Sequence, residues 1–280
     1  MGFFDFFKTK SIQEEIVLDK KEVDFSNFEL VANYIYEKSG ITDLQNRSLT
    51  ISRLKQLALS YDIYTTNDML QKIKSDIDFY QESINIATVN ETFFLREEKE
   101  LKWLVEYIKN SSQSRFKILS LPCSSGEEVY SILLLLDMED VDLNRIEIYG
   151  YDINSQAVDK AKSGIFDKHS LHKISDDMLD KYFIKVDDGY QIDSKLRQKA
   201  QFFQKNIFNI SNESQKYDIV LSRNMFIYFD DIKRTKALSI IMELLKDGGL
   251  YIKGHADNIQ QTTHLKQLVY GVYKFYQYPS

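Results

Sequence analysis

Segments typical of β-strands and α-helices alternate along the second half of the chain. RFKILSLP (115–122) and YDIVLSRN (217–224) are short apolar runs, and each precedes a longer stretch whose apolar residues have helical spacing. Such alternation builds βαβ units, in which helices cover both faces of a parallel sheet. The chain is therefore predicted to have an α/β fold with a mostly parallel, doubly wound sheet. Ligands of such sheets bind beside the carboxyl ends of the strands.

The residues before this alternation have a different character. From residue 26 to about residue 88, apolar residues recur at helical spacing, and Gly40 is a typical helix stop. No segment of this region has the pattern of a strand. The sequence therefore predicts an all-helical N-terminal domain at 26–88, preceded by a short N-terminal tail at 1–25.

The α/β domain, expected at 89–280, contains one interruption. Between residues 166 and 206 the alternation breaks, and short β-like pieces surround Asp188-Gly189, a common hairpin turn. We expect a small inserted β-subdomain at about 181–205. Long insertions into a regular fold are often functional.

Charge and composition argue against several classes of function. Lys and Arg total 36 against 42 Asp and Glu, and the net charge of −6 disfavours a broad nucleic-acid-binding surface. The single cysteine rules out a disulfide within the chain, and the four histidines have no metal-binding spacing, so no metal site is expected. The longest apolar run, ILLLL (132–136), is too short to span a bilayer. We expect a cytoplasmic protein, without nucleic acid as a partner and without stable membrane insertion.

The first predicted strand leads into an unusual turn, SSGEE (124–128). A turn that binds the phosphates of a nucleotide needs several glycines, whereas this one has a single glycine and ends in two acids, Glu127 and Glu128. Ser124 and Glu127 have the spacing of a helix capping box, which is one explanation of the first acid. The other explanation is that a carboxylate faces a ligand with positive charge.

Two further strand ends carry polar residues. Asp152 follows the second strand and suits a ribose diol, but it is equally well placed to cap the next helix. Arg223-Asn224 follows a later strand and suits a carboxylate, the alternative being a surface turn. A ligand with a ribose, a cationic part and a carboxylate, but no phosphate recognition, matches all three strand ends. S-adenosylmethionine has these groups, and its methyl group sits on a good leaving group, so positioning supplies most of the rate.

Six segments, taken in order, resemble the chemotaxis receptor methyltransferases of the CheR family. They are NETFFLR (90–96), SSGEEVYSI (124–132), YGYDIN (149–154), AKSGIF (161–166), SRNMFIYFD (222–230) and GGLYIKGH (248–255). The resemblance implies a Rossmann-like class I methyltransferase domain that uses S-adenosylmethionine and releases S-adenosylhomocysteine. The implied reaction methylates side-chain carboxylates of glutamates in chemotaxis receptors during sensory adaptation. The cytoplasmic helical domain of these receptors is the implied partner.

The resemblance also assigns site residues. By matching positions, it implies cofactor binding by Asn90, Thr92, Arg96, Glu127, Asp152, Asn206, Ile207, Arg223 and Asn224, and catalytic roles for Arg96 and Tyr228. Of the two adjacent acids, Glu127 is expected to face the ligand and Glu128 to point elsewhere. His255 ends a predicted strand, so it is a candidate for the pocket wall. The family usually has GHSE where this chain has GHAD, which puts the roles of Ala256 and Asp257 in doubt.

Receptor docking is expected on the helical domain. The stretch at 44–61 contains Arg47, Arg53 and Lys55 and no acid, so it is a candidate docking face for an acidic receptor bundle. An ordinary solvated helix face is the alternative. The predicted hairpin loop at 187–189 is short, so we expect no dependence on a C-terminal receptor pentapeptide. We also expect a monomer.

Three other functions are compatible with parts of this pattern. The main alternative is a catalytically silent cofactor-binding module that senses or scaffolds, and the presence of Arg96 and Tyr228 argues against it. A methyltransferase for a small molecule or a nucleic acid is the second, and the acidic balance disfavours nucleic acid. A nicotinamide oxidoreductase is the third, and the chain lacks its glycine fingerprint.

Overall fold

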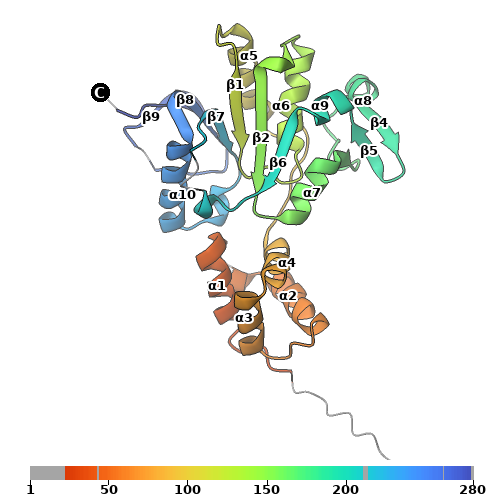
Figure 1. Cartoon of the computed structure of the whole chain (residues 1–280), viewed down its shortest axis with the longest axis vertical. Coiled ribbons are helices and arrows are strands. Elements are labelled where there is room, and N and C mark those ends of the chain that lie inside the picture. The colour runs from red at the N-terminus through yellow and green to blue at the C-terminus, as the bar shows by residue number, and fades with distance from the viewer. Residues whose placement is uncertain (1–22, 43, 211–213, 261, 279–280) are drawn as a thin grey trace, which may run out of the picture.

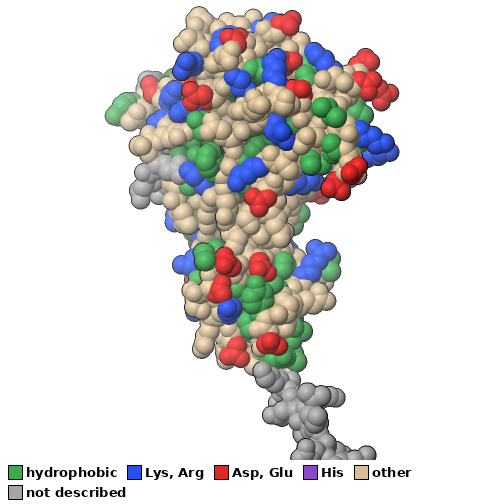
Figure 2. Space-filling view, turned by 45° about the vertical axis from the view of Figure 1, so that its right-hand side comes forward, with side chains coloured by type: hydrophobic (Ala, Val, Ile, Leu, Met, Phe, Trp, Pro, Cys, Tyr) green, Lys and Arg blue, Asp and Glu red, His purple; other side chains and the backbone are tan. Residues whose placement is uncertain are grey.

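The computed structural model describes residues 23–42, 44–210, 214–260 and 262–278. Most of the predicted tail at 1–25 therefore lies outside the described residues. The described chain forms a helical bundle and a larger α/β part, one above the other in Figure 1. None of its helices combines the length and the apolar character needed to cross a bilayer. Figure 2 shows acidic and basic side chains interspersed on one face of the molecule.

The α/β part is built on a seven-stranded sheet with the order β6-β2-β1-β7-β8-β10-β9. Its strands are β1 (Phe116–Ser120), β2 (Ile146–Asp152), β6 (Ala200–Gln204), β7 (Tyr217–Ser222), β8 (Leu245–Lys253), β9 (Leu265–Val269) and β10 (Val272–Phe275). The strands from β6 to β8 in this order pair in parallel, and β10 and β9 add an antiparallel edge. The predicted, mostly parallel sheet is thus confirmed.

Helices cover both faces of this sheet. The long ones are α5 (Glu98–Asn110), α6 (Glu127–Met138), α7 (Ser155–Ser163) and α10 (Asp231–Leu244). α5, α6 and α7 pack on one face and α10 on the other. Neighbouring strand residues point to opposite faces, so that Ile118 joins the core with α6 and Leu119 the core with α10. Because both faces are buried, the strands are continuous apolar runs, and this pattern is what predicted them.

A second sheet of three strands, with the order β3-β5-β4, is attached to the main one. It contains β3 (Ile165–Phe166), β4 (Phe183–Val186) and β5 (Gly189–Ile192), and the short helices α8 (Asp176–Tyr182) and α9 (Ser194–Arg197) flank its hairpin. The predicted bounds of 181–205 are partly wrong, because β6 pairs in parallel with β2 in the main sheet. The ring of Phe202 in β6 lies so close to Gly150 in β2 that a Cβ atom there would approach it to 2.6 Å.

The helical bundle consists of α1 (Glu29–Ser39), α2 (Ser48–Ser60), α3 (Thr66–Ser75) and α4 (Ile77–Ala87). These helices share a core of their own, in which Val31, Leu54 and Phe79 are fully buried. α1 ends where the sequence predicts. Gly40 is left-handed with φ of 77°, a conformation that favours glycine, and its N–H donates to the carbonyl of Tyr36.

The bundle packs against the carboxyl ends of the parallel strands. The amide of Asn85 in α4 donates to Ser155 Oγ, just beyond β2, over 2.9 Å. The N–H and the hydroxyl of Thr42 both donate to the carbonyl of Tyr228, beyond β7, over 3.0 and 2.8 Å. Figure 1 shows the bundle at this end of the sheet. The strand ends that were predicted to bind the ligand therefore face the bundle.

Candidate functional site

A cavity lies between the bundle and the carboxyl ends of β1, β2 and β7. Its wall includes the segment that joins the two parts, at 87–93, the turn after β1, at 121–124, and the segment after β7, at 223–225. The predicted site residues that line it are Asn90, Thr92, Arg96, Asp152, Asn206, Ile207, Arg223, Asn224 and Tyr228. The topology thus brings the predicted residues together, with Glu127 as the exception.

The two adjacent acids at the start of α6 exchange their expected positions. Glu127 is 0% exposed, and its carboxylate accepts hydrogen bonds from the hydroxyls of Ser125 and Ser170, so it points into the protein. Burial raises the pKa of Glu127 above its ordinary value, although these hydroxyls oppose the rise. Glu128 lines the cavity instead. The prediction that Glu127 faces the ligand is corrected, because consecutive helical residues point about 100° apart and this helix is set with Glu128 outward.

The turn between β1 and α6 has its own geometry. The capping box expected from Ser124 and Glu127 does not form, since Gly126 is the N-cap and no side chain caps the helix. Gly126 has φ of 93°, and a Cβ atom there would lie 3.0 Å from Ala161 Cβ and 3.1 Å from the ring of Phe202. The single glycine thus permits close packing of helix and sheet. It does not open a backbone cradle for phosphate.

Asp152 ends β2 with its carboxylate on the cavity wall. Oδ2 accepts from the N–H of Ser124 and Oδ1 from the N–H of Asn154, both over 2.8 Å. Burial raises the pKa of Asp152 to about 6, although the backbone N–H groups oppose the rise. The helix-cap alternative is wrong, because Asn154 caps α7 by accepting from the N–H of Ala157. The remaining lone pairs of Asp152 suit the hydroxyls of a ribose.

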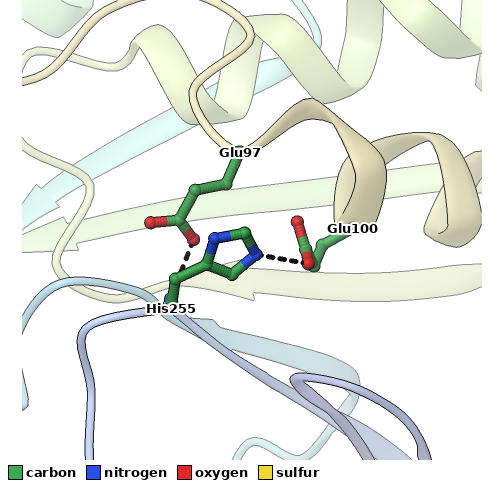
Figure 3. Close-up of side chains that lie close together, drawn as sticks. All are labelled: Glu97, Glu100 and His255. Atoms are coloured by element: carbon green, nitrogen blue, oxygen red, sulfur yellow. Dashed lines mark hydrogen bonds and ion pairs between the residues drawn. The ribbon is translucent and has the colours of Figure 1, made fainter.

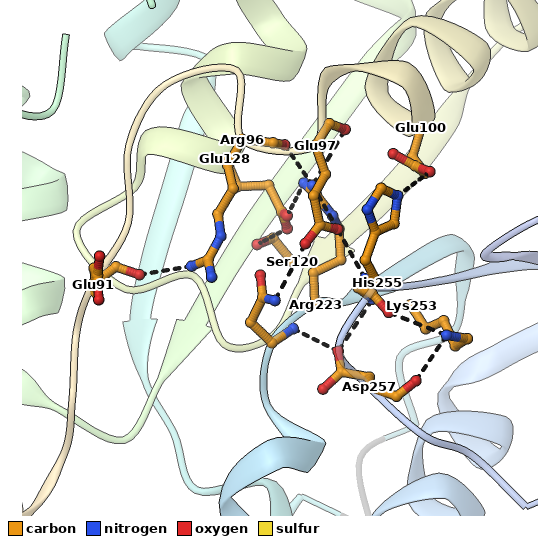
Figure 4. A network of polar contacts seen from close by, with 12 residues as sticks. Glu91, Arg96, Glu97, Glu100, Ser120, Glu128, Arg223, Lys253, His255 and Asp257 are labelled. Atoms are coloured by element: carbon orange, nitrogen blue, oxygen red, sulfur yellow. Dashed lines mark hydrogen bonds and ion pairs between the residues drawn. The ribbon is translucent and has the colours of Figure 1, made fainter. Parts of the chain in front are cut away.

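Arg223 is the centre of a buried network of charges beside the cavity (Figure 4). It is 5% exposed and forms ion pairs with Glu128 Oε2 at 2.6 Å and Glu97 Oε2 at 3.3 Å. Burial opposes the charge of Arg223, but the two acids outweigh it and raise the pKa of the guanidinium. The surface-turn alternative for this segment is therefore wrong. Arg223 Nε is buried without a partner among the described residues, so one donor of the guanidinium is unused.

Asp257 holds the segment that follows β7. Its carboxylate accepts from the N–H groups of Asn224, Phe226 and Gly254 over 2.5, 2.9 and 3.1 Å. Asn224 is left-handed, with φ of 58°, and these bonds fix that uncommon conformation. The acid in GHAD is therefore structural here, a role that the sequence left open.

His255 was predicted as a candidate for the pocket wall, but it is not part of the lining. Its Nε2 lies 2.6 Å from Glu100 Oε1 instead.

The three basic residues of the proposed docking face are separated in the structure. Arg47 lines the cavity, where its Nη1 donates to the carbonyl of Ala87 over 3.3 Å. Arg53 is exposed on α2, whereas the ammonium of Lys55 lies 5.5 Å from the ring of Phe28. The prediction of one continuous face is thus wrong for Arg47. The sequence pattern could not show this, because it does not say how the bundle sits on the sheet.

Arg96 and Tyr228 also line the cavity, and the charges of Arg47 and Arg96 both act on the phenol of Tyr228. Arg96 donates to the carbonyl of Glu91 over 2.8 Å, and the guanidinium carbon of Arg47 lies 5.7 Å from the centre of the Tyr228 ring. Burial raises the pKa of Tyr228, and the charges of Arg47 and Arg96 oppose the rise only in part. The phenol is therefore neutral near pH 7 and is able to donate a hydrogen bond.

The donor and acceptor set of the cavity fits S-adenosylmethionine. Asp152 offers acceptors for ribose hydroxyls, Glu128 is an acid on the wall for a cationic part, and Arg223 is a cation on the wall that suits a carboxylate. The turn that would meet a phosphate carries no run of glycines. When bound, S-adenosylmethionine supplies a methyl group that is activated by a positively charged sulfur.

Comparisons with known proteins identify the family of this chain. A family model described as CheR methyltransferase, SAM binding domain, matches residues 90–274. A chemotaxis protein methyltransferase of Campylobacter jejuni is 33% identical over 249 residues, which cover 88% of this chain and 93% of the relative. Chemotaxis protein methyltransferase 2 of Vibrio cholerae is 34% identical over 271 residues, which cover 90% of each chain. Since these matches span most of its length, the chain belongs to the CheR methyltransferases, and its cofactor is S-adenosylmethionine.

Proposed function

We propose that this chain transfers the methyl group of S-adenosylmethionine to side-chain carboxylates of glutamates in chemotaxis receptors, forming glutamate methyl esters. The CheR family supports methylation in chemotaxis. The choice of a carboxylate as the acceptor is carried by one observation, the presence of two guanidinium groups, Arg47 and Arg96, in the wall of the cavity. The proposed partner is the cytoplasmic helical domain of a receptor, and the enzyme acts on it in the cytoplasm as a monomer.

The two arginines suit the substrate side chain. A glutamate is ionised near pH 7, because its ordinary pKa is about 4.3. Arg47 and Arg96 attract and orient this charge, and each guanidinium has more donors than the single carbonyl bond described for it. An ionised carboxylate needs no general base to attack. Tyr228, with its neutral phenol, then acts as a hydrogen-bond donor that helps to hold the acceptor in line.

No covalent intermediate on the protein is required. Cys123 lines the cavity, but burial raises the pKa of its thiol well above the ordinary range. A protonated, buried thiol is a poor nucleophile. Direct transfer from the cofactor to the glutamate oxygen, with both reactants held in the cavity, is therefore the proposed route.

We also propose that methylation does not depend on binding of a C-terminal receptor pentapeptide. β4 and β5 are joined by Asp187 and Asp188 alone, with Val186 paired to Gly189, so the hairpin has little loop to enclose a peptide. Titration calorimetry with such a pentapeptide tests this point. We expect no binding, and a dissociation constant in the micromolar range would contradict the proposal.

Transfer of a labelled methyl group tests the reaction itself. The full chain is incubated with methyl-labelled S-adenosylmethionine and receptor-rich membranes, and the receptor band is treated with mild base. We expect base-labile label, because methyl esters hydrolyse whereas methyl groups on nitrogen remain. A receptor whose labelled glutamates are replaced by glutamine is the control and should take up no label. Label that survives base would overturn the proposed acceptor.

The second candidate function is a silent cofactor-binding module. Its support is that Asp152 and Arg223, on the sheet side of the cavity, are held by hydrogen bonds and an ion pair within the protein. Binding of the cofactor there would not need a substrate group. Calorimetric binding of the cofactor by the chain, without transfer to receptors, would favour this function over methyl transfer.

A further inference from the structure

Three side chains beside the cavity, but outside its lining, converge on one point. Glu97 and Glu100 stand at the start of α5, and His255 follows β8. One ligand atom from each residue lies within 4.8 Å of those from the other two. Figure 3 shows the imidazole between the two carboxylates. The cavity that was assigned to S-adenosylmethionine does not include any of the three.

Glu100 is a buried acid whose bonding is incomplete. Its side chain is only 6% exposed, and Oε1 lies 2.6 Å from His255 Nε2. Oε2 is buried and has no hydrogen-bond partner among the described residues. A buried carboxylate oxygen without a hydrogen-bond partner is costly, and a bound ligand at this atom would explain it.

The charges of the surrounding network do not cancel. Figure 4 shows the hydrogen bonds and ion pairs that link these residues. The acids of the network are Glu97, Glu100, Glu128 and Asp257, and its cations on this side are Arg223 and Lys253. Leaving His255 aside, these four acids outnumber the two cations by two. A divalent cation would balance this excess.

Glu97 is already oriented by hydrogen bonds, and His255 is accessible from solvent. The Glu97 carboxylate accepts from the backbone N–H of His255 over 3.0 Å and from the amide of Asn224 over 3.3 Å. Such outer hydrogen bonds usually hold the carboxylate ligands of a metal. The side chain of His255 is 46% exposed, which gives an ion a path from solvent.

We propose that Glu97, Glu100 and His255 bind a divalent transition-metal ion, with Zn²⁺ as the best match. One imidazole nitrogen and two carboxylate oxygens are common zinc ligands, and water would complete a four-coordinate site. The ion joins the start of α5 to the segment after β8. It stabilises the network that holds Arg223, and it is not required for the chemistry of methyl transfer.

Zinc binding by the full chain tests this site. After dialysis against a chelator, the protein is titrated with Zn²⁺ in competition with a chromophoric chelator, and its melting temperature is followed. We expect one bound ion per chain and a higher melting temperature. His255→Ala and Glu100→Gln should each weaken binding by at least about tenfold. His264→Ala is the matched control and should bind as the wild type does, because its Nδ1 faces the carbonyl of Tyr276 away from the cluster.

Several results would overturn the proposal. One is the absence of Zn²⁺ binding to the wild type, which would leave His255 and Glu100 as a hydrogen-bonded pair. Another is unchanged binding in His255→Ala. Loss of binding in His172→Ala would place the ion at the His169 and His172 pair, whose rings are 5.9 Å apart. X-ray absorption of the zinc-loaded wild type does not depend on how the variants fold, and it should show one imidazole ligand; two would contradict the assignment.

Discussion

The two sides of the cavity are built in different ways. On the sheet side the charges are buried and paired within the protein: Asp152 accepts two backbone N–H groups, and Arg223 is held by two glutamates. On the bundle side, Arg47 is half-buried and has a carbonyl at 3.3 Å and the ring of Tyr228 as neighbours. The polar groups of the sheet side are thus held in place by the protein itself, whereas Arg47 on the bundle side has donors left for a bound substrate.

This difference separates binding of the cofactor from binding of the receptor. A site whose groups are already held needs little reorganisation, which suits a small ligand of constant structure. A cation with unused donors suits a side chain presented by another protein. Changes on the sheet side should therefore alter stability and cofactor affinity, and changes on the bundle side should alter the KM for the receptor.

The largest effect is expected from Arg223→Ala. This change leaves Glu97 and Glu128, with side chains 14% and 13% exposed, without their cation. Breaking a buried ion pair costs about 3–5 kcal/mol, and we expect this loss in the free energy of unfolding measured in urea. Arg145→Ala is the control, since its guanidinium donates only to the carbonyls of Ser111 and Gln113 in the bonds described. An equal loss in both variants would show that the ion pairs of Arg223 contribute no more to the free energy of unfolding than the hydrogen bonds of Arg145.

Asp152→Asn should come next and should act on the cofactor. The variant loses the charge that accepts the ribose hydroxyls, and hydrogen bonds to a charged group contribute about 1.5–3 kcal/mol. We expect calorimetry to show an affinity for S-adenosylmethionine that is about 10- to 100-fold weaker. Asp142→Asn, which alters an exposed acid that accepts from the N–H of Asn144, is the control and should leave the affinity unchanged. Equal affinity in both variants would remove Asp152 from the cofactor site.

The raised pKa of Asp152 also leads to a prediction of how cofactor binding depends on pH. Burial raises the pKa of Asp152 to about 6, so the group is ionised above that pH and protonated below it. Only the ionised form accepts from both ribose hydroxyls. Affinity should therefore be constant above about pH 7 and fall by up to about tenfold per unit as the pH drops below 6. Asp152→Asn should lack this dependence, and a flat wild-type profile would contradict the assignment.

On the bundle side, Arg47→Ala should affect the receptor alone. The loss of one cation that meets the substrate carboxylate should raise the KM for receptor by about tenfold, which corresponds to about 1.4 kcal/mol. Cofactor affinity should not change, because Asp152 and Arg223 remain in place. A change in cofactor affinity as large as the change in KM would mean that the two sides of the cavity are not independent.

Charge reversal at Arg53 should give the smallest effect. Arg53 is exposed on α2 and lies outside the cavity, so it acts only through the long-range field. Steering of this kind is screened by salt. We expect Arg53→Glu to raise the KM for receptor about two- to fivefold at low salt and less at high salt. Receptor kinetics that do not change at low salt would reject a docking role for α2.

The parallel sheet and the meeting of its strand ends were predictable from the sequence. Strands that are buried on both faces must be continuous apolar runs, and parallel strands bring their carboxyl ends to one edge. For this reason Asp152 and Arg223 lie at the same cavity although 71 positions separate them in the chain. The family resemblance added the linker residues around Arg96, which no strand pattern indicates.

Other features depended on geometry that residue types do not encode. Whether Glu127 or Glu128 faces the cavity is decided by the left-handed Gly126, which sets the rotation of α6. Arg47 reaches the cavity because of the way the bundle docks, and helical periodicity does not contain that information. The role of Asp257 depends on hydrogen bonds from three backbone N–H groups. Those of Asn224 and Phe226 lie 33 and 31 positions away in the chain, so the sequence could not show them.

The hydrogen bonds from Thr42 to the carbonyl of Tyr228 have a mechanical consequence. Thr42 follows α1 closely, so any tilt of the bundle is transmitted to the backbone of this tyrosine. A receptor helix that presses on the bundle would therefore shift Tyr228 together with Arg47. Binding of the receptor to the bundle would in this way change the positions of groups at the site of methyl transfer.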